Sequence, residues 1–517
     1  MNGAESLVST LVAGGVETCF TNPGTSEMHI VAALDRLGPL GKMRCILGLF
    51  EGVVTGAADG YARMAGKPAC TLLHLAAGLA NGLANLHNAS RAQAPIINLV
   101  GQHATYHLRH NSPLRADIEA IARPYSKWLR TSSTSHEAGM DAAEAIVAAR
   151  SAPSGIATLI VPADVAWSEG GALGVVPPLA QASLPIAETI ERAAVMLRSG
   201  LRTGMLIAGN ALYGKGLASA GRIASATGAR LLAPYPFSRI ERGAGTAMID
   251  RVPYVPEQAA EQLKEFRQLI LVGTSLPVSY FAYPGKNSVL TSPECEIHAL
   301  ASPGEDCAGA LGILADALPL RETPLLTEKV DRPPVPGGSI TLPGLAAAVA
   351  ALLPEHAIVV DESMTSGRGM MAAARGGPHH DWLANTGGSI GIALPLAVGA
   401  AVACPSRRVL CLTADGSGMY TLQSLWTMAR EGLNITIVVF ANRAYAVLQR
   451  EFLGLGRGAP GPLAADLFDI SRPDLDWVLL AKAMGVPGAR ADSLDALAQA
   501  LRNGFASDGP TLIEVAL

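Results

Sequence analysis

Short apolar runs alternate with helical segments rich in Gly and Ala in the first part of the chain. The apolar runs occupy 43–50, 68–74 and 95–101, and the helical segments between them span 51–66 and 78–93. Each run is long enough for a strand that is buried on both faces, as in a parallel sheet covered by helices. The pattern predicts an α/β fold.

The same alternation returns twice further along the chain, once from about Gly204 and once from 356 to 442. Two stretches rich in Pro and Gly, 167–185 and 318–338, separate the three regions and are interpreted as linkers. A chain of 517 residues also exceeds one hydrophobic core, since single cores stop growing at about 250 to 300 residues. The sequence therefore predicts three doubly wound parallel-sheet domains, at residues 1–170, 186–320 and 340–517.

Composition and charge narrow the classes of function. Hydrophobic residues make up 49% and charged residues 16% of the chain, which is typical of a globular protein. The 39 Lys and Arg residues nearly balance the 43 Asp and Glu residues without a block of one sign, so nucleic acid and anionic membranes are disfavoured as partners. The longest apolar stretch, Ile392 to Cys404, contains Pro395 and falls short of the roughly 20 residues of a membrane helix.

Two smaller signals concern the compartment in which the chain works. The first 20 residues contain no Lys or Arg, so the charged start of a secretory signal is missing and a cytoplasmic protein is expected. The seven cysteines show no CxxC spacing, which favours reduced thiols in the core over disulfides or zinc.

Two polar residues stand at the ends of neighbouring predicted strands in the third region. Asp415 follows the apolar run that ends at Ala414, and Asn442 follows the run that ends at Ala441. One helical crossover joins the runs, so both side chains are expected at the carboxyl edge of a parallel sheet, where such sheets bind ligands. A carboxylate, an amide oxygen and a backbone carbonyl, here assigned to Ala444, form a hard oxygen site suited to Mg²⁺.

Small residues follow the predicted carboxylate ligand. Gly416 and Ser417 allow close approach of the backbone, and the start of the next helix favours an anion, so the implied ligand is a diphosphate with magnesium. An ordinary turn is the alternative for Asp-Gly alone. The spacing of Asp415 and Asn442 resembles the metal and diphosphate signature of thiamine diphosphate enzymes, although alanines replace the residues usually found directly before both ligands.

The amino-terminal region makes this resemblance more specific. The motif at 22–27, then Glu51, then His74 resemble in order the pyrimidine-binding domain of benzoylformate decarboxylase and its relatives in the acetolactate synthase-like group. The resemblance covers nearly the whole chain. It implies the cofactors thiamine diphosphate and Mg²⁺, a small 2-oxo acid as substrate, and a homodimer or homotetramer whose sites are shared between chains.

The chemistry of the cofactor gives Glu51 a role. Thiamine diphosphate becomes reactive at C2 when a carboxyl group protonates the far ring nitrogen of its aminopyrimidine, and burial can raise a carboxyl pKa until it shares that proton. The alternative is a Glu that begins a helix beside a favourable dipole.

The resemblance implies His74 as the proton-transfer residue, and it places Thr25 where a hydroxyl contacts substrate, with Ser26 as the alternative. Without the resemblance, a core histidine and turn residues would be the ordinary interpretation.

Two further segments enter through the resemblance. It implies that the Gly388 carbonyl contacts the 4′-amino group and that the Ile390 side chain supports the bent cofactor, which brings the reacting atoms together. A Gly-rich turn is the alternative there.

In the middle region, Phe281 stands at or near the position of a second active-site histidine in benzoylformate decarboxylase. Because phenylalanine cannot relay a proton, this difference argues against benzoylformate itself as the substrate.

The resulting hypothesis is a thiamine diphosphate and Mg²⁺ dependent 2-oxo acid decarboxylase. The sequence leaves open whether the product leaves as an aldehyde or is joined to a second carbonyl compound. An acetolactate synthase-type carboligase is the nearest alternative, and a non-catalytic relative that only binds the cofactor is the other.

Overall fold

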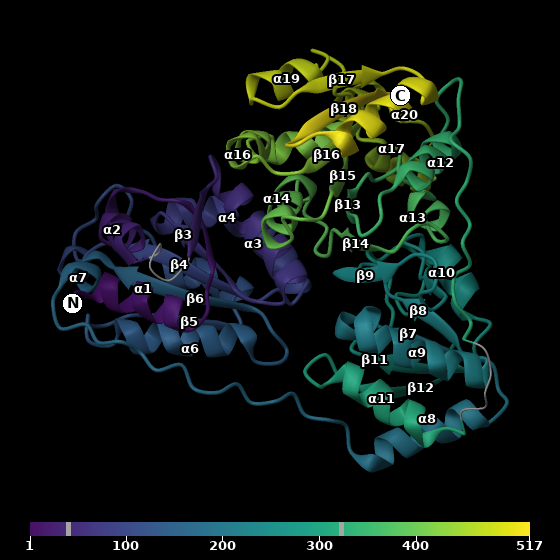
Figure 1. The fold of residues 1–517 in the computed structure, drawn as a ribbon, viewed down its shortest axis with the longest axis horizontal. Coiled ribbons are helices and arrows are strands. Elements are labelled where there is room, and N and C mark those ends of the chain that lie inside the picture. Colours follow the sequence, from purple (N-terminus) through teal and green to yellow (C-terminus); the bar gives the residue numbers. More distant parts are fainter. Residues whose placement is uncertain (38–42, 320–324, 457) are drawn as a thin grey trace. The chain divides into compact units, whose positions relative to one another are not determined.

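The computed structural model describes residues 1–37, 43–319, 325–456 and 458–517 (Figure 1). These residues form two compact units: the first contains 1–179, 333–373 and 385–517, and the second contains 180–332 and 374–384. Three sheets organise the described residues, and parallel pairs dominate all three. The predicted fold class is therefore confirmed, whereas the predicted domain boundaries stay a prediction.

The first sheet consists of six parallel strands in the order β2-β1-β3-β4-β6-β5. Its strands are β1 (Thr18–Asn22), β2 (Arg44–Leu47), β3 (Ala69–Leu73), β4 (Ile96–Gln102), β5 (Trp128–Thr131) and β6 (Ile156–Pro162). The helices of this region are α1 (Gly3–Ala13), α2 (Met28–Leu37), α3 (Glu51–Ala65), α4 (Leu75–Arg91), α5 (Ile118–Ala122), α6 (Ala138–Arg150) and α7 (Ala163–Trp167). The strands and helices predicted between 43 and 101 form within a few residues of their expected positions.

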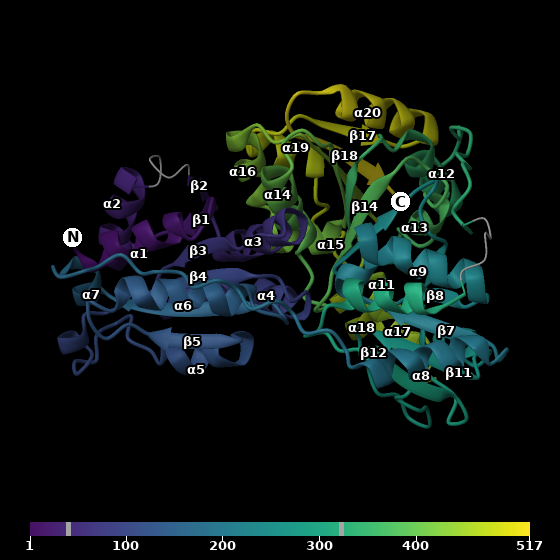
Figure 2. The same ribbon diagram turned by 60° about the horizontal axis from the view of Figure 1, so that its bottom comes forward.

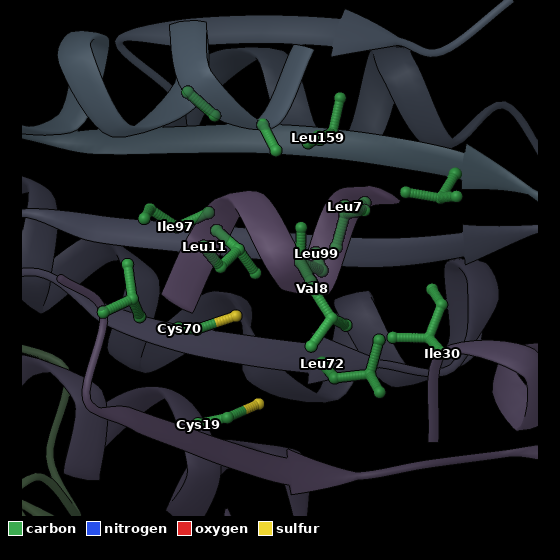
Figure 3. Packing of buried hydrophobic residues seen from close by; sticks show 14 of the residues in the cluster. Leu7, Val8, Leu11, Cys19, Ile30, Cys70, Leu72, Ile97, Leu99 and Leu159 are labelled. Carbon is green, nitrogen blue, oxygen red and sulfur yellow. The ribbon is translucent and has the colours of Figure 1, made fainter. Parts of the chain in front are cut away.

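Helix α1 packs on one face of this sheet and forms part of its core (Figure 3). The Asn2 side chain accepts a hydrogen bond from the Glu5 N–H, and the Glu5 carboxylate accepts one from the Asn2 N–H, which fixes the start of the helix. The helix then presents Leu7, Val8 and Leu11 to the sheet. The strand residues in this cluster include Leu72, Ile97, Leu99 and Leu159.

Three cysteines lie side by side on neighbouring strands of the same sheet. Cys19 on β1 is the direct partner of Cys45 on β2 and of Cys70 on β3. Cys19 and Cys70 are buried, whereas Cys45 is exposed. All seven cysteines of the chain are free thiols, as predicted, but only five of them are buried, because Cys45 is exposed and Cys404 is half-buried.

Five strands of the third sheet lie in the first unit, in the order β17-β18-β16-β15-β13, and all four pairs are parallel. They are β13 (Ile358–Glu362), β15 (Val409–Ala414), β16 (Ile435–Ala441), β17 (Gly488–Ala491) and β18 (Thr511–Ala516). The helices are α12 (Leu342–Leu352), α13 (Met370–Ala373), α14 (Ala393–Ala403), α15 (Asp415–Gly418), α16 (Ser424–Glu431), α17 (Ala446–Gly454), α18 (Pro462–Phe468), α19 (Trp477–Ala483) and α20 (Leu494–Ala506). Helix α14 packs against α3, so two distant parts of the chain meet within this unit (Figures 1 and 2).

The second unit holds a five-stranded parallel sheet in the order β10-β8-β7-β11-β12. Its strands are β7 (Thr203–Ile207), β8 (Arg230–Ala233), β10 (Ile249–Arg251), β11 (Gln268–Val272) and β12 (Glu296–Ala301), and its helices are α8 (Ala187–Arg198), α9 (Gly214–Thr227), α10 (Pro256–Leu263) and α11 (Cys307–Ala317). A short antiparallel pair, β9 (Arg239–Arg242) with β14 (His380–Ala384), also lies in this unit. The sequence does not predict this pair, because neither strand has the apolar run of six to eight residues that marks the buried parallel strands.

Two remaining sequence expectations concern the apolar stretch and the linkers. The stretch from Ile392 to Cys404 forms the 11-residue helix α14. Within the described ranges, no helix is long and apolar enough to cross a membrane. The predicted linker at 318–338 includes residues 320–324, which lie outside the described residues.

Candidate active site

The carboxyl edge of the first sheet gathers the predicted residues of the amino-terminal region. Strand β1 ends at Asn22, strand β2 leads to Glu51 at the first position of α3, and strand β3 leads to His74, the N-cap of α4. Because these three strands are parallel neighbours, their carboxyl ends meet at one edge, where open α/β sheets bind ligands.

A buried carboxylate orients His74. The Glu27 side chain is fully buried, and its Oε2 lies 2.8 Å from His74 Nδ1. The Ser26 hydroxyl donates to Glu27 Oε1 at 2.8 Å, and the Gly24 N–H donates to Glu27 Oε2 at 2.9 Å. A carboxylate at Nδ1 favours the tautomer that carries its proton there and leaves Nε2 for exchange with a ligand. We call Glu27, His74 and Ser26 the histidine cluster.

The sequence interpretation assigned no role to Glu27. Glu27 is the last residue of the motif at 22–27, and its place in this motif is the one feature of the sequence that indicates a functional role. Its pairing with His74 joins residues 47 positions apart, and the fold was needed to show it. The structure also distinguishes the two hydroxyl candidates: Ser26 Oγ lies 3.3 Å from His74 Nδ1, whereas the Thr25 side chain is exposed.

Backbone geometry at this edge is tight. A Cβ atom on Gly24 would lie 2.0 Å from His74 Nδ1, so the imidazole ring packs directly on the backbone of the 22–27 motif. Leu75, the residue after His74, has a φ of 50°, a left-handed conformation that is rare for a residue with a branched side chain. Such conformations persist where the surrounding structure imposes them, and they concentrate at functional sites.

Glu51 lies close to the same edge and is mostly buried, with 8% of its surface exposed. Its Oε2 accepts a hydrogen bond from Asn81 Nδ2 at 3.0 Å. The backbone of α4 passes nearby at Gly78, where an added Cβ would lie 3.2 Å from Glu51 Oε1. The carboxyl group is thus held in a defined position and keeps part of its surface open to a ligand.

The carboxyl edge of the third sheet carries the predicted metal ligands. Asp415 follows β15 and Asn442 follows β16, and the two strands pair in parallel up to Ala414 and Phe440. Asp415 Oδ1 accepts from the Gly416 N–H at 2.9 Å, and Oδ2 accepts from the Arg443 N–H at 2.7 Å. The strand-end prediction for both side chains therefore holds.

Local loop conformations fix this second group of residues. Asn442 Oδ1 accepts from the Ala444 N–H at 3.1 Å, and Arg443 between them has a left-handed φ of 56°. The Arg443 guanidinium lies 2.7 Å from the Asp474 carboxylate. Asp415 is the first residue of the four-residue helix α15, which also contains Gly416 and Ser417.

The donor set suits a hard cation. Burial raises the pKa of Asp415, which means that its negative charge lacks full compensation in the protein alone. One carboxylate, one amide oxygen and the Ala444 carbonyl are the oxygen donors that Mg²⁺ prefers, with phosphate oxygens and water completing its shell. Among the described residues, no group of three or more His, Cys, Asp or Glu could hold a metal ion, so any metal here must rely on this mixed set.

The segment 385–391 carries Gly388 and Ile390. Gly388 is exposed and has a φ of 80°, which favours glycine, and Ile390 is half-buried. The fully buried Glu362 at the end of β13 accepts from the Gly391 N–H at 3.1 Å and from Asn385 Nδ2 at 3.0 Å. Burial raises the pKa of Glu362 to about 7 despite these donors.

The structure does not bring all predicted residues together. Phe281 lies in the second unit, is 55% exposed, and packs edge-on against Tyr280 with ring centres 5.4 Å apart. Within the described residues, no hydrogen bond or ion pair joins Glu51 or the histidine cluster to Asp415 or Asn442. The predicted residues form separate groups at the edges of two sheets.

Two family models match the chain. Residues 1–121 match the N-terminal TPP binding domain of thiamine pyrophosphate enzymes, and residues 366–515 match the C-terminal TPP binding domain. The first range contains Glu51 and His74, and the second contains Asp415 and Asn442. Both groups of residues described above therefore lie in matched regions.

Individual proteins are similar over their full lengths. A Mycobacterium tuberculosis protein provisionally named acetolactate synthase large subunit IlvX is 51% identical, over 100% of this chain and 99% of the relative. Benzoylformate decarboxylase of Pseudomonas aeruginosa is 28% identical, over 97% of this chain and 96% of the relative. The solved structure of a thiamine diphosphate-dependent 4-hydroxybenzoylformate decarboxylase from Rhodococcus jostii RHA1 has a TM-score of 0.86 at 23% identity, over 100% and 99% of the two chains.

Proposed function

Because the chain belongs to the thiamine diphosphate enzymes, in the group of benzoylformate decarboxylase and the acetolactate synthase-like proteins, we propose that it decarboxylates a 2-oxo acid with thiamine diphosphate and Mg²⁺. The observation that carries the proposal is the edge of the first sheet, where Glu51 and the carboxylate-oriented His74 lie on parallel strand ends. One group suits activation of the cofactor, and the other suits proton transfer to or from the substrate.

Two groups of residues would hold the cofactor. Asp415, Asn442 and the Ala444 carbonyl would bind Mg²⁺, with the backbone at Gly416 and Ser417 close to the diphosphate. The Gly388 carbonyl and the Ile390 side chain would contact the aminopyrimidine and support its bent conformation. When bound, thiamine diphosphate supplies a nucleophilic carbon for the keto group and an electron sink for the bond that releases CO₂.

The residues of the first edge would move protons. Glu51 would exchange a proton with the ring nitrogen of the aminopyrimidine, a task for which a mostly buried carboxyl group is suited. His74 would transfer a proton at the substrate through Nε2 while Glu27 holds Nδ1. The Ser26 hydroxyl, or the exposed Thr25 hydroxyl, would hydrogen-bond the substrate.

A direct test is incubation of the protein, loaded with thiamine diphosphate and Mg²⁺, with a panel of aryl and alkyl 2-oxo acids. We expect CO₂ and one aldehyde in equal amounts for at least one acid. Release of CO₂ with a 2-hydroxy ketone would instead identify a carboligase. No CO₂ from any acid, with cofactor bound, would contradict the proposal and favour a protein that only binds the cofactor.

Carboligation is the second candidate, because the 51% identical relative carries an acetolactate synthase name. Phe281 offers a way to separate the two reactions. If Phe281 faces the substrate, Phe281→His adds an acid that can protonate the product and should shift the ratio of aldehyde to hydroxy ketone toward aldehyde. An unchanged ratio and an unchanged pH profile would place Phe281 outside the site.

We also propose that the active protein is a homodimer or homotetramer whose sites are shared between chains. Among the described residues of the first unit, no hydrogen bond or ion pair joins the proton-handling residues to the metal ligands, which supports this arrangement because one cofactor must contact both groups. In such an assembly the first sheet of one chain would face the third sheet of another.

A further inference from the structure

A buried asparagine of helix α4 forms hydrogen bonds with the backbone of the segment 385–391. Asn88 is fully buried, and its Nδ2 donates to the Ser389 carbonyl at 2.8 Å. Its Oδ1 accepts from the Ser389 N–H at 3.2 Å. The Asn88 side chain therefore satisfies both backbone groups of one residue, as a neighbouring strand does in a sheet.

Further hydrogen bonds join α4 to the start of the segment. The Thr386 hydroxyl donates to the Asn88 carbonyl at 2.6 Å, and His87 Nε2 lies 3.1 Å from the Gly387 carbonyl. A Cβ on Gly387 would lie 2.6 Å from Asn88 Oδ1, so the close approach needs a glycine there. Three residues of the segment, Thr386, Gly387 and Ser389, are thus hydrogen-bonded to α4.

Helix α3 joins the same network. Arg63 Nη2 donates to Thr386 Oγ1 at 3.0 Å, and Arg63 forms a buried ion pair with Asp59 one turn earlier. Asn85 accepts from Asn88 Nδ2 at 3.0 Å and donates to the Gly52 carbonyl at 2.7 Å. All these atoms lie away from bulk water, where hydrogen bonds are strengthened and unpaired groups are costly.

The location of Ser389 suggests a function for its hydrogen bonds with Asn88. Ser389 separates Gly388 from Ile390, the two residues that the proposed function assigns to the aminopyrimidine. On the other side of the segment, Glu362 accepts from the Gly391 N–H. The segment is therefore held from both sides, and Asn88 is its main attachment to the helices that begin at Glu51 and just after His74.

We propose that Asn88 is a positioning residue that sets the Gly388 carbonyl and the Ile390 side chain at the spacing the aminopyrimidine requires. The inference rests on the proposed function and deepens it. The rival explanation is that Asn88 only stabilises the fold by joining two parts of the first unit. The two explanations differ in whether loss of the side chain acts locally on 385–391 or on the unit as a whole.

The test compares Asn88→Ala with Asn98→Ala in the full-length protein. Asn98 is a matched control because it is equally buried and its side chain is hydrogen-bonded at both ends, to Thr71 at 2.8 Å and Thr158 at 3.1 Å, inside the first sheet. Amide hydrogen exchange of 385–391 is measured without cofactor, and thiamine diphosphate binding with Mg²⁺ is measured by calorimetry. Unfolding temperature is recorded for both variants.

We expect Asn88→Ala to speed exchange at Ser389 and Gly391 and to weaken cofactor binding about tenfold, which is one net hydrogen bond converted to a binding constant. Asn98→Ala should lower the unfolding temperature and leave both readings as in the wild type. Equal exchange and equal binding in the two variants would overturn the proposal. If Asn88→Ala does not fold, Asn88→Asp replaces the Nδ2 that donates to Ser389 and to Asn85 with a carboxylate oxygen, and it is expected to act in the same direction, with the same overturning result.

The outcome also separates this inference from the proposed function. A wild-type chain that binds no thiamine diphosphate would contradict the proposed function directly. The exchange measurement needs no cofactor, so it still decides whether Asn88 holds the segment. Faster exchange in Asn88→Ala with unchanged cofactor binding would overturn the positioning role and leave the proposed function intact.

Discussion

The two sheet edges of the first unit organise charge in different ways. At the first edge, Glu27 is paired with the His74 side chain, which comes from a neighbouring strand. At the edge of the third sheet, Asp415 and Asn442 accept hydrogen bonds from backbone N–H groups of their own loops, and burial raises the pKa of Asp415. The Glu27 carboxylate in the first sheet thus has a side-chain partner, whereas in the third sheet the backbone donors offset only part of the effect of burial on Asp415. We infer that the first edge serves proton transfer and that the third serves cation binding.

The largest effect is expected from Asp415→Ala. Removing the only carboxylate of the mixed donor set leaves the diphosphate charge without its metal, so retention of thiamine diphosphate should fall at least about 100-fold. Calorimetry with and without Mg²⁺ measures the loss. The matched control is Asp474→Ala, which removes an exposed carboxylate that pairs with Arg443 nearby. Undiminished retention in Asp415→Ala would refute the metal site.

The next effect tests the first edge. Glu51→Gln keeps the size of the side chain and a partner for Asn81 but removes the exchangeable proton, so cofactor should bind while proton exchange at its C2 slows about 100-fold or more. NMR of the bound cofactor follows the exchange. Glu27→Gln serves as the comparison, because it alters His74 and should leave C2 exchange unchanged. A wild-type exchange rate in Glu51→Gln would remove Glu51 from the activation step.

A third prediction asks whether the two edges that build one site come from one chain. Glu51→Gln chains and Asp415→Ala chains are mixed under conditions of subunit exchange. In a hybrid dimer with shared sites, one site collects both defects and the other combines an intact Glu51 with an intact Asp415. Activity should therefore return in the mixture, toward one competent site per hybrid. Continued inactivity with exchange confirmed by mass spectrometry would mean that each site is built within a single chain.

The smallest effect concerns Glu362, which holds the segment 385–391 from the third sheet. Its pKa rises from 4.5 to about 7 on folding because of burial, so the folded protein binds a proton more tightly than the unfolded chain does. This contribution to stability is complete below pH 4.5 and is lost as the pH rises to 7, by roughly 3 kcal/mol at most. Glu362→Gln should remove this part of the pH dependence.

Denaturant unfolding of both chains at several pH values measures the difference. The free energy of unfolding of the wild type should decline relative to that of Glu362→Gln between pH 4.5 and 7. Parallel curves for the two proteins would contradict the assignment and would mean that the backbone donors at Gly391 and Ala393 keep this carboxylate charged throughout.

The sequence correctly predicts where a residue lies when its place follows from the local order of strands and helices. Asp415 and Asn442 could be placed together because apolar runs define strand ends, and parallel strands bring those ends to one edge. Glu51 and His74 also follow apolar runs, but their assignment to the site rests on the resemblance to benzoylformate decarboxylase. The choice between Thr25 and Ser26 could not be made, since it depends on the direction in which a short turn points its side chains.

The residues that were missed act through contacts between distant parts of the chain. Glu27 meets a histidine 47 positions later, Glu362 meets an amide N–H 29 positions later, and Asn88 meets Ser389 301 positions later. No periodicity or motif encodes such partners. The role of a buried acid or amide of this kind therefore becomes visible only when the fold shows its partner.

The row of cysteines on β2, β1 and β3 offers an experimental handle on the first edge. Cys45 is the exposed member of the row, and strand β2 leads from it to Glu51. The adjoining Cys19 thiol and partial burial raise the pKa of Cys45, which slows its reaction with a maleimide dye, so its labelling relies on its exposure. Because five of the other cysteines are buried and Cys404 is half-buried, one fluorophore would report selectively on the strand that carries the activating carboxylate. Its emission could then follow ligand arrival in real time without any engineered residue.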